Sequence, residues 1–211
     1  NCKPQNTWNL RETMHKRIRL GMVGGGQGAF IGAVHRIAAR LDDRYELVAG
    51  ALSSNPERAA TSAEEIGINI DRSYADFRKM ATAESKRVDG IEAVTIATPN
   101  HLHAEVSIAF AEVGIDVICD KPMTFSLEEA LEVANVVKKS GVTFTLTHNY
   151  TGYPMIREAR SLVQNGALGK IRVIKRLKTT QKPQLLFART RCTLIWFPNS
   201  PLGQIVLTVS I

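Results

Sequence analysis

The residues with the clearest chemistry form a glycine-rich segment after an apolar run. Residues 18–23 have the pattern of a buried strand, and Gly24-Gly25-Gly26-Gln27-Gly28-Ala29 follows them. In the pattern G-x-G-x-x-A, glycines allow a tight turn and let backbone N–H groups approach a pyrophosphate at a helix N-terminus. The position between a first strand and a first helix favours dinucleotide binding over a purely structural turn. We expect cofactor contacts from Gly24, Gly26, Gln27, Ala29, Phe30 and Ile31.

The end of the second expected strand bears on the type of dinucleotide. In NAD-binding proteins a carboxylate at this tip holds the ribose 2′-OH. Here Ser53 and Ser54 stand at the tip, and Arg58 follows. Hydroxyls and a guanidinium can accommodate a 2′-phosphate, which favours NADP over NAD. Alternatively, the two serines form a turn and Asn55 caps the next helix, and this does not exclude the first interpretation.

Three further polar motifs follow expected strands. The first is Thr98-Pro99-Asn100 with His103, the second is Asp120-Lys121-Pro122, and the third contains Asn149 and Tyr150. Because ligands of open α/β sheets bind at the carboxyl ends of the strands, we expect these motifs to share one edge with the glycine loop. For three residues a structural role stays open: His103 as an early-helix residue, Lys121 as a surface lysine and Tyr150 as a core-edge residue.

Alternating short apolar runs and helical patterns predict the elements that position these motifs. We expect strands at residues 18–23, 45–49, 93–97, 116–119 and 143–147, and helices at residues 30–41, 56–66, 74–85, 103–113, 126–140 and 154–165. The pattern predicts βαβ units, hence an α/β fold with a doubly wound parallel sheet and helices on both faces. Ile31, Val34, Ala38 and Leu41 mark one helix face, and Leu127, Ala130, Leu131 and Ala134 mark another.

Composition excludes several classes of protein. With 44% hydrophobic and 22% charged residues, the chain resembles neither a disordered protein nor a coiled coil. No apolar run approaches the ~20 residues of a membrane helix, so we expect no membrane partner. Three widely spaced cysteines indicate no disulfide framework and no metal site, and the first residues lack the hydrophobic core of a signal peptide. These features predict a cytoplasmic protein.

The formal net charge of +7 comes almost entirely from the last part of the chain. Residues 175–211 contain six Lys and Arg residues and no Asp or Glu, and without them the charge falls to +1. The helical and strand periodicity also ends near Ile174. The basic excess is therefore a property of an atypical basic tail. The rest of the chain is nearly neutral, so its charge does not indicate an anionic partner.

The glycine loop, the Thr98-Pro99-Asn100 turn with His103 and the Asp120-Lys121-Pro122 motif together resemble the Gfo/Idh/MocA family over about residues 16–174. The resemblance implies a Rossmann-type fold, NAD or NADP as cofactor, and a sugar, inositol or related polyol as substrate. It also implies that Lys121 lies beside the nicotinamide and the substrate hydroxyl and that the Lys121–Pro122 bond is cis. Asp120 stands where the family has Glu.

The further cofactor contacts that the resemblance implies come from the three motifs, namely Thr98, Pro99, Asn100, His103, Asp120, Lys121, Pro122 and Asn149, with Tyr150 on the substrate side.

The resemblance also implies a second α/β domain, with a catalytic histidine and surfaces that make full-length relatives homo-oligomers. No histidine follows His148, so we expect this domain to be largely missing. We predict an N-terminal extension at 1–15, a dinucleotide-binding domain at 16–174 and a tail at 175–211 that a shifted reading frame would explain.

Two other functions compete with an oxidoreductase. One is a dinucleotide-binding module without catalysis. The other, which is remote, is a nucleic-acid binder that uses the basic tail, with Phe187 and Trp196 as stacking residues.

Overall fold

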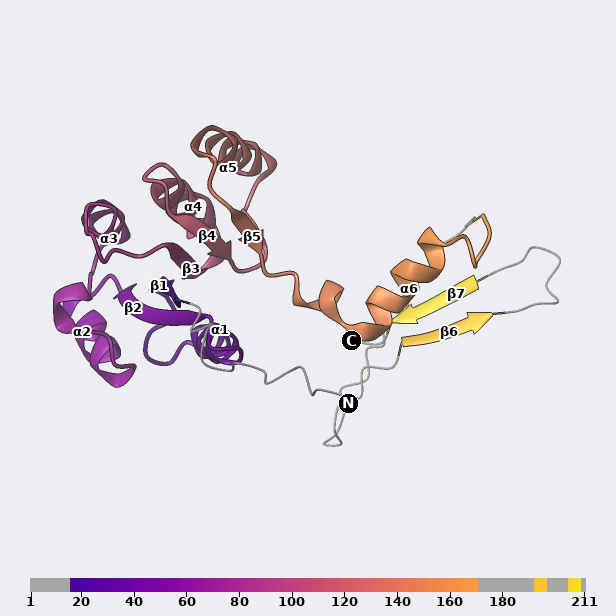
Figure 1. Ribbon diagram of the computed structural model, residues 1–211, viewed down its shortest axis with the longest axis horizontal. Helices are drawn as coiled ribbons and strands as arrows, with labels where there is room; N and C mark the ends of the chain where they lie inside the picture. The colour runs from indigo at the N-terminus through magenta and orange to yellow at the C-terminus, as the bar shows by residue number, and fades with distance from the viewer. Residues whose placement is uncertain (1–15, 171–191, 197–204, 210–211) are drawn as a thin grey trace, which may run out of the picture. The chain divides into compact units, whose positions relative to one another are not determined.

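The computed structural model describes residues 16–170 and the backbone of two later strands. The chain divides into two compact units, Asn1–Thr147 and His148–Ile211 (Figure 1). The predicted extension at 1–15 and the predicted domain end at residue 174 lie outside the described residues. Among the described helices, none combines the length and the apolar character that a membrane span requires.

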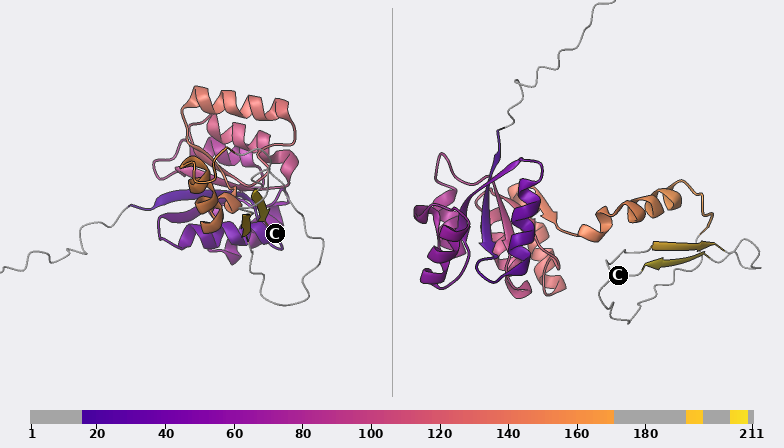
Figure 2. Two further views of the ribbon diagram at one scale, coloured as in Figure 1. Left: turned by 90° about the vertical axis from the view of Figure 1, so that its right-hand side faces the viewer. Right: turned by 90° about the horizontal axis from the view of Figure 1, so that it is seen from below.

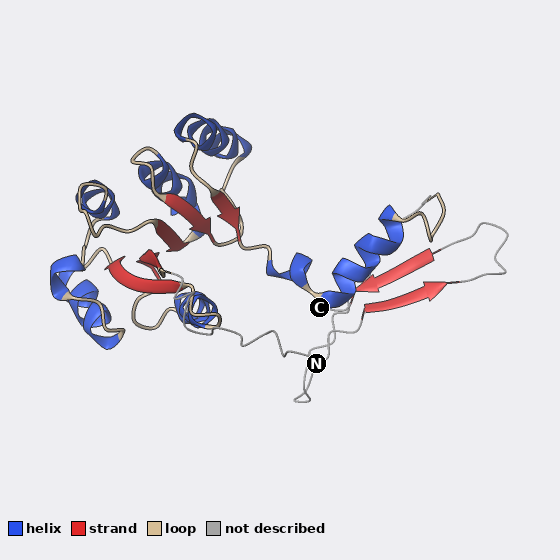
Figure 3. Ribbon diagram, in the orientation of Figure 1, coloured by secondary structure: helices blue, strands red, loops and turns tan. Residues whose placement is uncertain are grey.

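The first unit is built on a parallel sheet in the order β2-β1-β3-β4-β5 (Figure 3). The strands are β1 Ile18–Gly24, β2 Tyr45–Ala51, β3 Ala93–Ala97, β4 Asp116–Cys119 and β5 Phe144–Leu146. Beyond β2, Ser73 adds an isolated parallel bridge to Gly50. From β1 the chain moves to β2 on one side and then to β3, β4 and β5 on the other. The order in which the strands are added therefore reverses between β1 and β3, and such folds bind their ligands at this switch point.

Helices cover both faces of this sheet, as Figure 2 shows from two further sides. Helix α1 lies on one face, and α4 and α5 lie on the other (Figure 1). The helices of the first unit are α1 Phe30–Arg40, α2 Pro56–Glu65, α3 Phe77–Glu84, α4 His103–Ala111 and α5 Leu127–Ser140, with 3₁₀ turns η1 Ile70–Arg72 and η2 Asn100–Leu102. The predicted doubly wound α/β fold is confirmed.

The core of the unit lies around the middle of the sheet. Every residue of β3 is buried, as expected for a strand covered on both faces. Val94 and Ile96 of β3, Val117 of β4 and Phe110 of α4 belong to one cluster of buried apolar side chains. The sheet is thus rigid at its centre, directly below the loops that follow β1, β3 and β4.

The apolar faces that spacing marks on two helices are not the faces that meet the sheet. Leu41, which follows α1, is 81% exposed, whereas the buried residue of the helix is Gly32, whose lack of a side chain lets α1 approach the backbone of Gly25. On α5, Leu127 and Leu131 are exposed, whereas Val133 on the neighbouring face is buried. Spacing alone predicted an apolar stripe in both helices but not which face meets the sheet.

Both ends of α5 are capped by local structure. The side chain of Ser126 accepts a hydrogen bond from the Glu129 backbone N–H at the start of α5, and Gly141 ends that helix in a left-handed conformation. Helix α3 begins later than predicted. It starts at Phe77, because the Asp76 carboxylate accepts from the N–H groups of Arg78 and Lys79.

A buried polar network joins η1 to the end of α3. The Arg72 guanidinium donates twice to the Glu84 carboxylate, which is almost completely buried. Glu84 also accepts from the Tyr74 hydroxyl at 3.0 Å and from the Ile91 N–H at 3.2 Å. Burial and the hydrogen bond to Glu84 raise the pKa of Tyr74 to about 12. Ile91 stands just before β3, so this network lies at the amino end of that strand.

The second unit begins with the 3₁₀ turn η3 Asn149–Gly152 and helix α6 Pro154–Gln164. Asn165 follows α6 and Gly166 has a positive φ, which agrees with the predicted helix end. The remaining described elements are β6 Cys192–Trp196 and β7 Ile205–Val209, which pair in antiparallel fashion. Both strands fall within the predicted basic tail.

Candidate cofactor site

The glycine loop after β1 is held close to the ends of its neighbouring strands. Gly24 has a φ of 73°, and a Cβ atom there would stand 2.7 Å from the Ala97 carbonyl oxygen of β3. A Cβ on Gly32 would collide with the backbone of Gly25. Glycine is therefore required at both positions for the loop to lie between β3 and the first turn of α1.

The N-terminus of α1 is open to an anion. Ala29 precedes the helix without a side-chain cap, and the first turn contains no acidic residue. The first backbone N–H groups of a helix have no intrahelical acceptor, and the helix dipole favours negative charge there. The predicted loop residues Gly26, Gln27, Ala29 and Phe30 also line a hollow of about 320 Å³. These features fit the pyrophosphate of a dinucleotide.

Residues of α1 and α2 that the sequence did not single out hold this loop in place. The Ser62 hydroxyl accepts from the Gln27 N–H at 3.0 Å, and Glu65 accepts from the Gln27 side chain at 2.8 Å. The Arg36 guanidinium donates to the Gly25 carbonyl oxygen at 2.8 Å. Gln27 thus contacts α2 in this structure. No motif marks Ser62 or Glu65, because their role depends on where α2 packs.

At the tip of β2 the structure shows the turn and the Asn55 helix cap that the alternative interpretation describes. The Asn55 side chain accepts from the Arg58 N–H at 3.0 Å and caps α2, and the Ser53 hydroxyl accepts from the Asn55 N–H at 3.2 Å. Ser54 and the Arg58 side chain are exposed, and Arg58 makes no ion pair within the described part of the chain. A contact of these residues with a ribose phosphate stays a prediction.

The turn after β3 presents Pro99 and Asn100 to solvent, and Asn100 begins η2. The Thr98 hydroxyl is buried and has no hydrogen-bond partner among the described residues. An unpaired buried hydroxyl costs free energy that a ligand could recover by bonding to it. Thr98 therefore fits the predicted cofactor contact.

In the segment after β4, Lys121 and Pro122 are exposed and Asp120 is partly buried. The Lys121 side chain is exposed, and the Lys121–Pro122 bond is cis as predicted. The Asp120 carboxylate instead accepts from the Thr147 hydroxyl at 2.9 Å and lies 3.8 Å from Nε2 of His35. Both of these partners are side chains of the protein, and a contact of Asp120 with the cofactor stays a prediction.

His103 is directed inward. Its ring is 1% exposed, with Nδ1 2.6 Å from the Pro122 carbonyl oxygen and Nε2 3.0 Å from the Thr98 carbonyl oxygen. Both nitrogens are therefore occupied by backbone groups of the two loops. Of the two roles that the sequence left open, the structure favours that of a support for these loops over a direct cofactor contact.

Asn149 and Tyr150 belong to the second unit. They lie in η3, where Tyr150 meets Tyr153 edge to face with ring centroids 5.5 Å apart. Their predicted place beside the nicotinamide and substrate stays a prediction.

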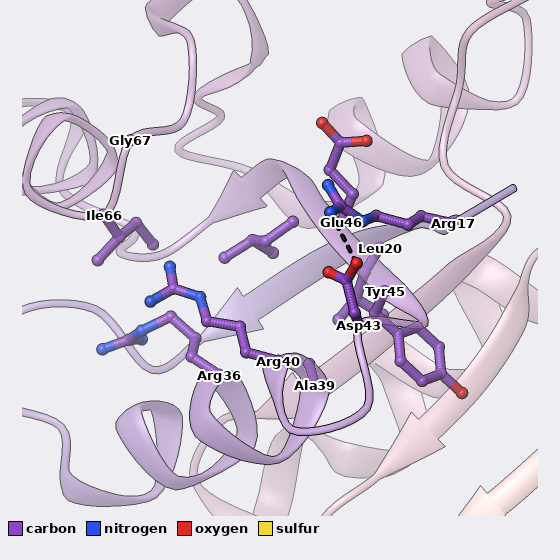
Figure 4. A pocket seen from close by; sticks show the side chains of 11 residues that line it. Arg17, Leu20, Arg36, Ala39, Arg40, Asp43, Tyr45, Glu46, Ile66 and Gly67 are labelled. Atoms are coloured by element: carbon purple, nitrogen blue, oxygen red, sulfur yellow. Dashed lines mark hydrogen bonds and ion pairs between the residues drawn. The ribbon is translucent and has the colours of Figure 1, made fainter. Parts of the chain in front are cut away.

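A separate cavity of about 340 Å³ lies beside α1, between the start of β2 and the end of α2 (Figure 4). The guanidinium groups of Arg36 and Arg40 point toward it, and Arg17 pairs with Asp43 at its rim (Figure 4). None of the predicted site residues lines this cavity. It is therefore not part of the candidate cofactor site.

A doubly wound sheet with a glycine loop after its first strand defines a nucleotide-binding Rossmann domain. The sequence model of the GFO_IDH_MocA family, described as "Oxidoreductase family, NAD-binding Rossmann fold", matches residues 18–148. The chain belongs to this family. The predicted family, oxidoreductase class and nicotinamide cofactor are therefore confirmed at the level of the family.

Individual relatives agree with this assignment. An oxidoreductase structure from Sinorhizobium meliloti is 56% identical, with a TM-score of 0.73, and the match covers 77% of this chain and 45% of that one. An inositol dehydrogenase homologue from Azotobacter vinelandii, solved with NADH and myo-inositol, is 37% identical with a TM-score of 0.74, covering 78% and 43%. Levoglucosan dehydrogenase from Pseudarthrobacter phenanthrenivorans is 33% identical over 163 residues, covering 74% and 39%. The chain thus spans less than half of each relative.

Proposed function

We propose that the full-length protein is an NAD(P)-dependent oxidoreductase that transfers hydride between nicotinamide and a hydroxyl-bearing carbon of a sugar, inositol or related polyol. The observation that carries this proposal is the open N-terminus of α1 behind the glycine loop, at the same sheet edge as Lys121. The relatives named above, which include an inositol dehydrogenase homologue and levoglucosan dehydrogenase, support the substrate class. Cytoplasmic location and homo-oligomeric assembly belong to the same proposal.

Each part of the site has a separate task in this reaction. Bound nicotinamide would supply the hydride chemistry. The N–H groups of the first turn of α1 bind and orient the pyrophosphate, and the Thr98 hydroxyl bonds to the cofactor. The exposed Lys121 ammonium donates a hydrogen bond to the substrate hydroxyl. It stabilises the charge that develops as this hydroxyl gives its proton to the catalytic histidine that the family resemblance implies in the second domain. Asn149 and Tyr150 orient the substrate side.

The role of Lys121 is tested by separating binding from turnover. Lys121→Met should leave NADH affinity, measured by fluorescence titration, close to that of the unmodified chain. In the full-length protein it should lower polyol-dependent reduction of NAD(P)⁺ by about a hundredfold, the cost of losing one charge-stabilising donor. Lys138→Met on α5 is the matched control and should change neither quantity. A chain that binds neither NADH nor NADPH would overturn the proposed function.

We further propose that Ser53, Ser54 and Arg58 contact the ribose phosphate and favour NADP. Arg58→Ala should weaken NADPH binding by about tenfold and leave NADH binding unchanged, because only the 2′-phosphate carries charge for the guanidinium. Lys79→Ala removes the same charge from α3 and should affect neither cofactor. Equal effects of Arg58→Ala on both cofactors would contradict the proposed preference.

A dinucleotide-binding module without catalysis is the second candidate for this chain. The observation in its favour is that the glycine loop and the open N-terminus of α1 can bind a dinucleotide without any group from a second domain. NADH binding without reduction of NAD(P)⁺ by any member of a polyol panel would favour the module. Reduction by this chain would exclude it.

A further inference from the structure

Two buried imidazoles contact the residues on either side of Lys121. His35 on α1 lies 3.8 Å from the Asp120 carboxylate through Nε2, and its side chain is 9% exposed. His103 on α4 lies 2.6 Å from the Pro122 carbonyl oxygen through Nδ1. The two helices cover opposite faces of the sheet (Figure 1). The segment that carries Lys121 is therefore contacted from both faces.

One tautomer of the His35 ring accounts for both of its polar contacts. Its Nδ1 lies 2.7 Å from the hydroxyl of Thr95, a buried residue of β3. If this hydroxyl donates to Nδ1, the ring proton is on Nε2 and faces the Asp120 carboxylate. Thr147, at the end of β5, donates to the same carboxylate at 2.9 Å. Asp120 is thus held from α1 and from β5.

His103 joins two loops that belong to the candidate site. Its Nδ1 contacts the Pro122 carbonyl after β4, and its Nε2 contacts the Thr98 carbonyl after β3 at 3.0 Å. Carbonyl oxygens only accept, so a proton on Nδ1 makes the shorter of these contacts a hydrogen bond. Through this bond, α4 fixes the residue that directly follows Lys121.

We propose that His35 and His103 are positioning residues that aim Lys121, each through one ring nitrogen. Nε2 of His35 acts on Asp120, and Nδ1 of His103 acts on the carbonyl of Pro122. The proposal rests on the proposed function, because it assigns a purpose to the orientation of Lys121. It also links the two halves of the site: α1 begins at the glycine loop, so the helix that binds pyrophosphate holds the residue before Lys121.

Asparagine and glutamine variants test each nitrogen separately. The Asn amide nitrogen takes roughly the place of Nδ1, and that of Gln takes roughly the place of Nε2. His35→Gln and His103→Asn should therefore keep the contacts to Asp120 and Pro122, whereas His35→Asn and His103→Gln should lose them. Within each pair, both variants remove one imidazole and keep one contact. A merely structural role predicts no such reversal between the two positions.

The measurement is amide hydrogen exchange in the chain without cofactor. The Asp120 N–H donates to the Ile96 carbonyl at 3.1 Å and reports on the segment. It should exchange about fivefold faster in His103→Gln, as expected from the loss of one hydrogen bond. In His35→Asn, which loses only the 3.8 Å contact, it should exchange faster by a smaller factor, and in the partner variants at the original rate. The Val117 N–H of β4, which donates to the Thr143 carbonyl oxygen just before β5, is the internal control and should not change. Equal rates within both pairs would overturn the proposal.

A further pair of variants, at Thr147, provides a test if the histidine variants do not fold. Thr147→Val removes the other donor to Asp120, and Thr147→Ser keeps it. The valine variant alone should show faster exchange at Asp120, and no difference between the two would count against the proposal. NADH titration then separates the two ideas. If the unmodified chain fails to bind NADH, the proposed function fails, while the exchange pattern still decides whether the histidines hold the segment.

Discussion

Two buried polar networks in the first unit differ in strength and in place. In the first, the Arg72 guanidinium donates twice to Glu84, and Tyr74 and Ile91 complete the bonds to that carboxylate at the amino end of β3. In the second, the Asp120 carboxylate at the carboxyl end of β4 has a hydroxyl donor at 2.9 Å and the His35 ring at 3.8 Å. The Glu84 network contains a bidentate ion pair with Arg72, whereas the Asp120 network has one hydrogen bond and one longer contact.

The difference follows the two edges of the sheet. A buried charge that loses its partner is costly, so a bidentate pair fixes the elements it joins and depends on both residues. A network with a longer contact can readjust when a ligand binds nearby. The ligand edge therefore has the looser network, and the opposite edge has the tighter one. The predictions that follow test this contrast.

The largest expected effect is on folding, through Glu84. Glu84→Ala should lower the free energy of unfolding by about 3–5 kcal/mol, because it leaves the Arg72 guanidinium buried without its partner. Urea unfolding measures this loss. Glu105→Ala is the matched control, since it breaks the ion pair between Arg78 and Glu105, both largely exposed, and should cost less than about 1 kcal/mol. Similar costs for the two variants would remove the contrast between the networks.

The second prediction concerns the thiol next to Asp120. Cys119 is completely buried, and burial raises the pKa of its thiol to about 11. With Cys2 and Cys192 replaced by Ser, alkylation at pH 8 should be about a hundredfold slower than in the unfolded chain, because little thiolate forms. Alkylation at the rate of the unfolded chain would show that water reaches the base of the Asp120 network.

Asp120→Asn should have a smaller effect on stability. The amide oxygen still accepts from Thr147, so the free energy of unfolding should fall by about 1 kcal/mol or less. The NADH affinity of the folded protein should fall more in Asp120→Asn than in Glu84→Ala, because Asp120 holds the segment at the proposed ligand edge of the sheet and Glu84 lies at the opposite edge. Unfolding by urea and fluorescence titration give the two quantities. A loss of stability as large as that of Glu84→Ala would make the two networks equivalent.

The sequence predicted the fold well because its signals are local. The glycines after β1, the Ser126 cap and the alternation of strands and helices depend on neighbours along the chain. The cis bond at Pro122 was implied by the family resemblance, which rests on short motifs of the same kind. These features would survive in any chain that keeps the same few residues together.

The supports of the site could not be predicted, because their partners are distant in sequence. His35 meets Asp120 only when α1 lies on the sheet, and Thr95 joins them from the middle of β3. The hydrogen bond to Asp120 comes from Thr147 at the end of another strand. No spacing rule relates these positions, so the sequence offered Asp120 as a cofactor contact without indicating these partners.

The smallest effect is the dependence of stability on pH through His35. Burial lowers the pKa of His35 below its ordinary 6.5, although Asp120 opposes this shift. The unfolded chain therefore takes up a proton below pH 6.5 before the folded ring does, so stability is lost as the pH falls through this window and levels off below the folded pKa. The loss cannot exceed about 1.4 kcal/mol per pH unit for one proton. Urea unfolding between pH 5 and pH 8 should show this slope in the unmodified chain and a weaker one in His35→Gln. If His35 instead added stability on acidification, its attraction to Asp120 would outweigh burial, and the second network would resemble the first in being held by charge.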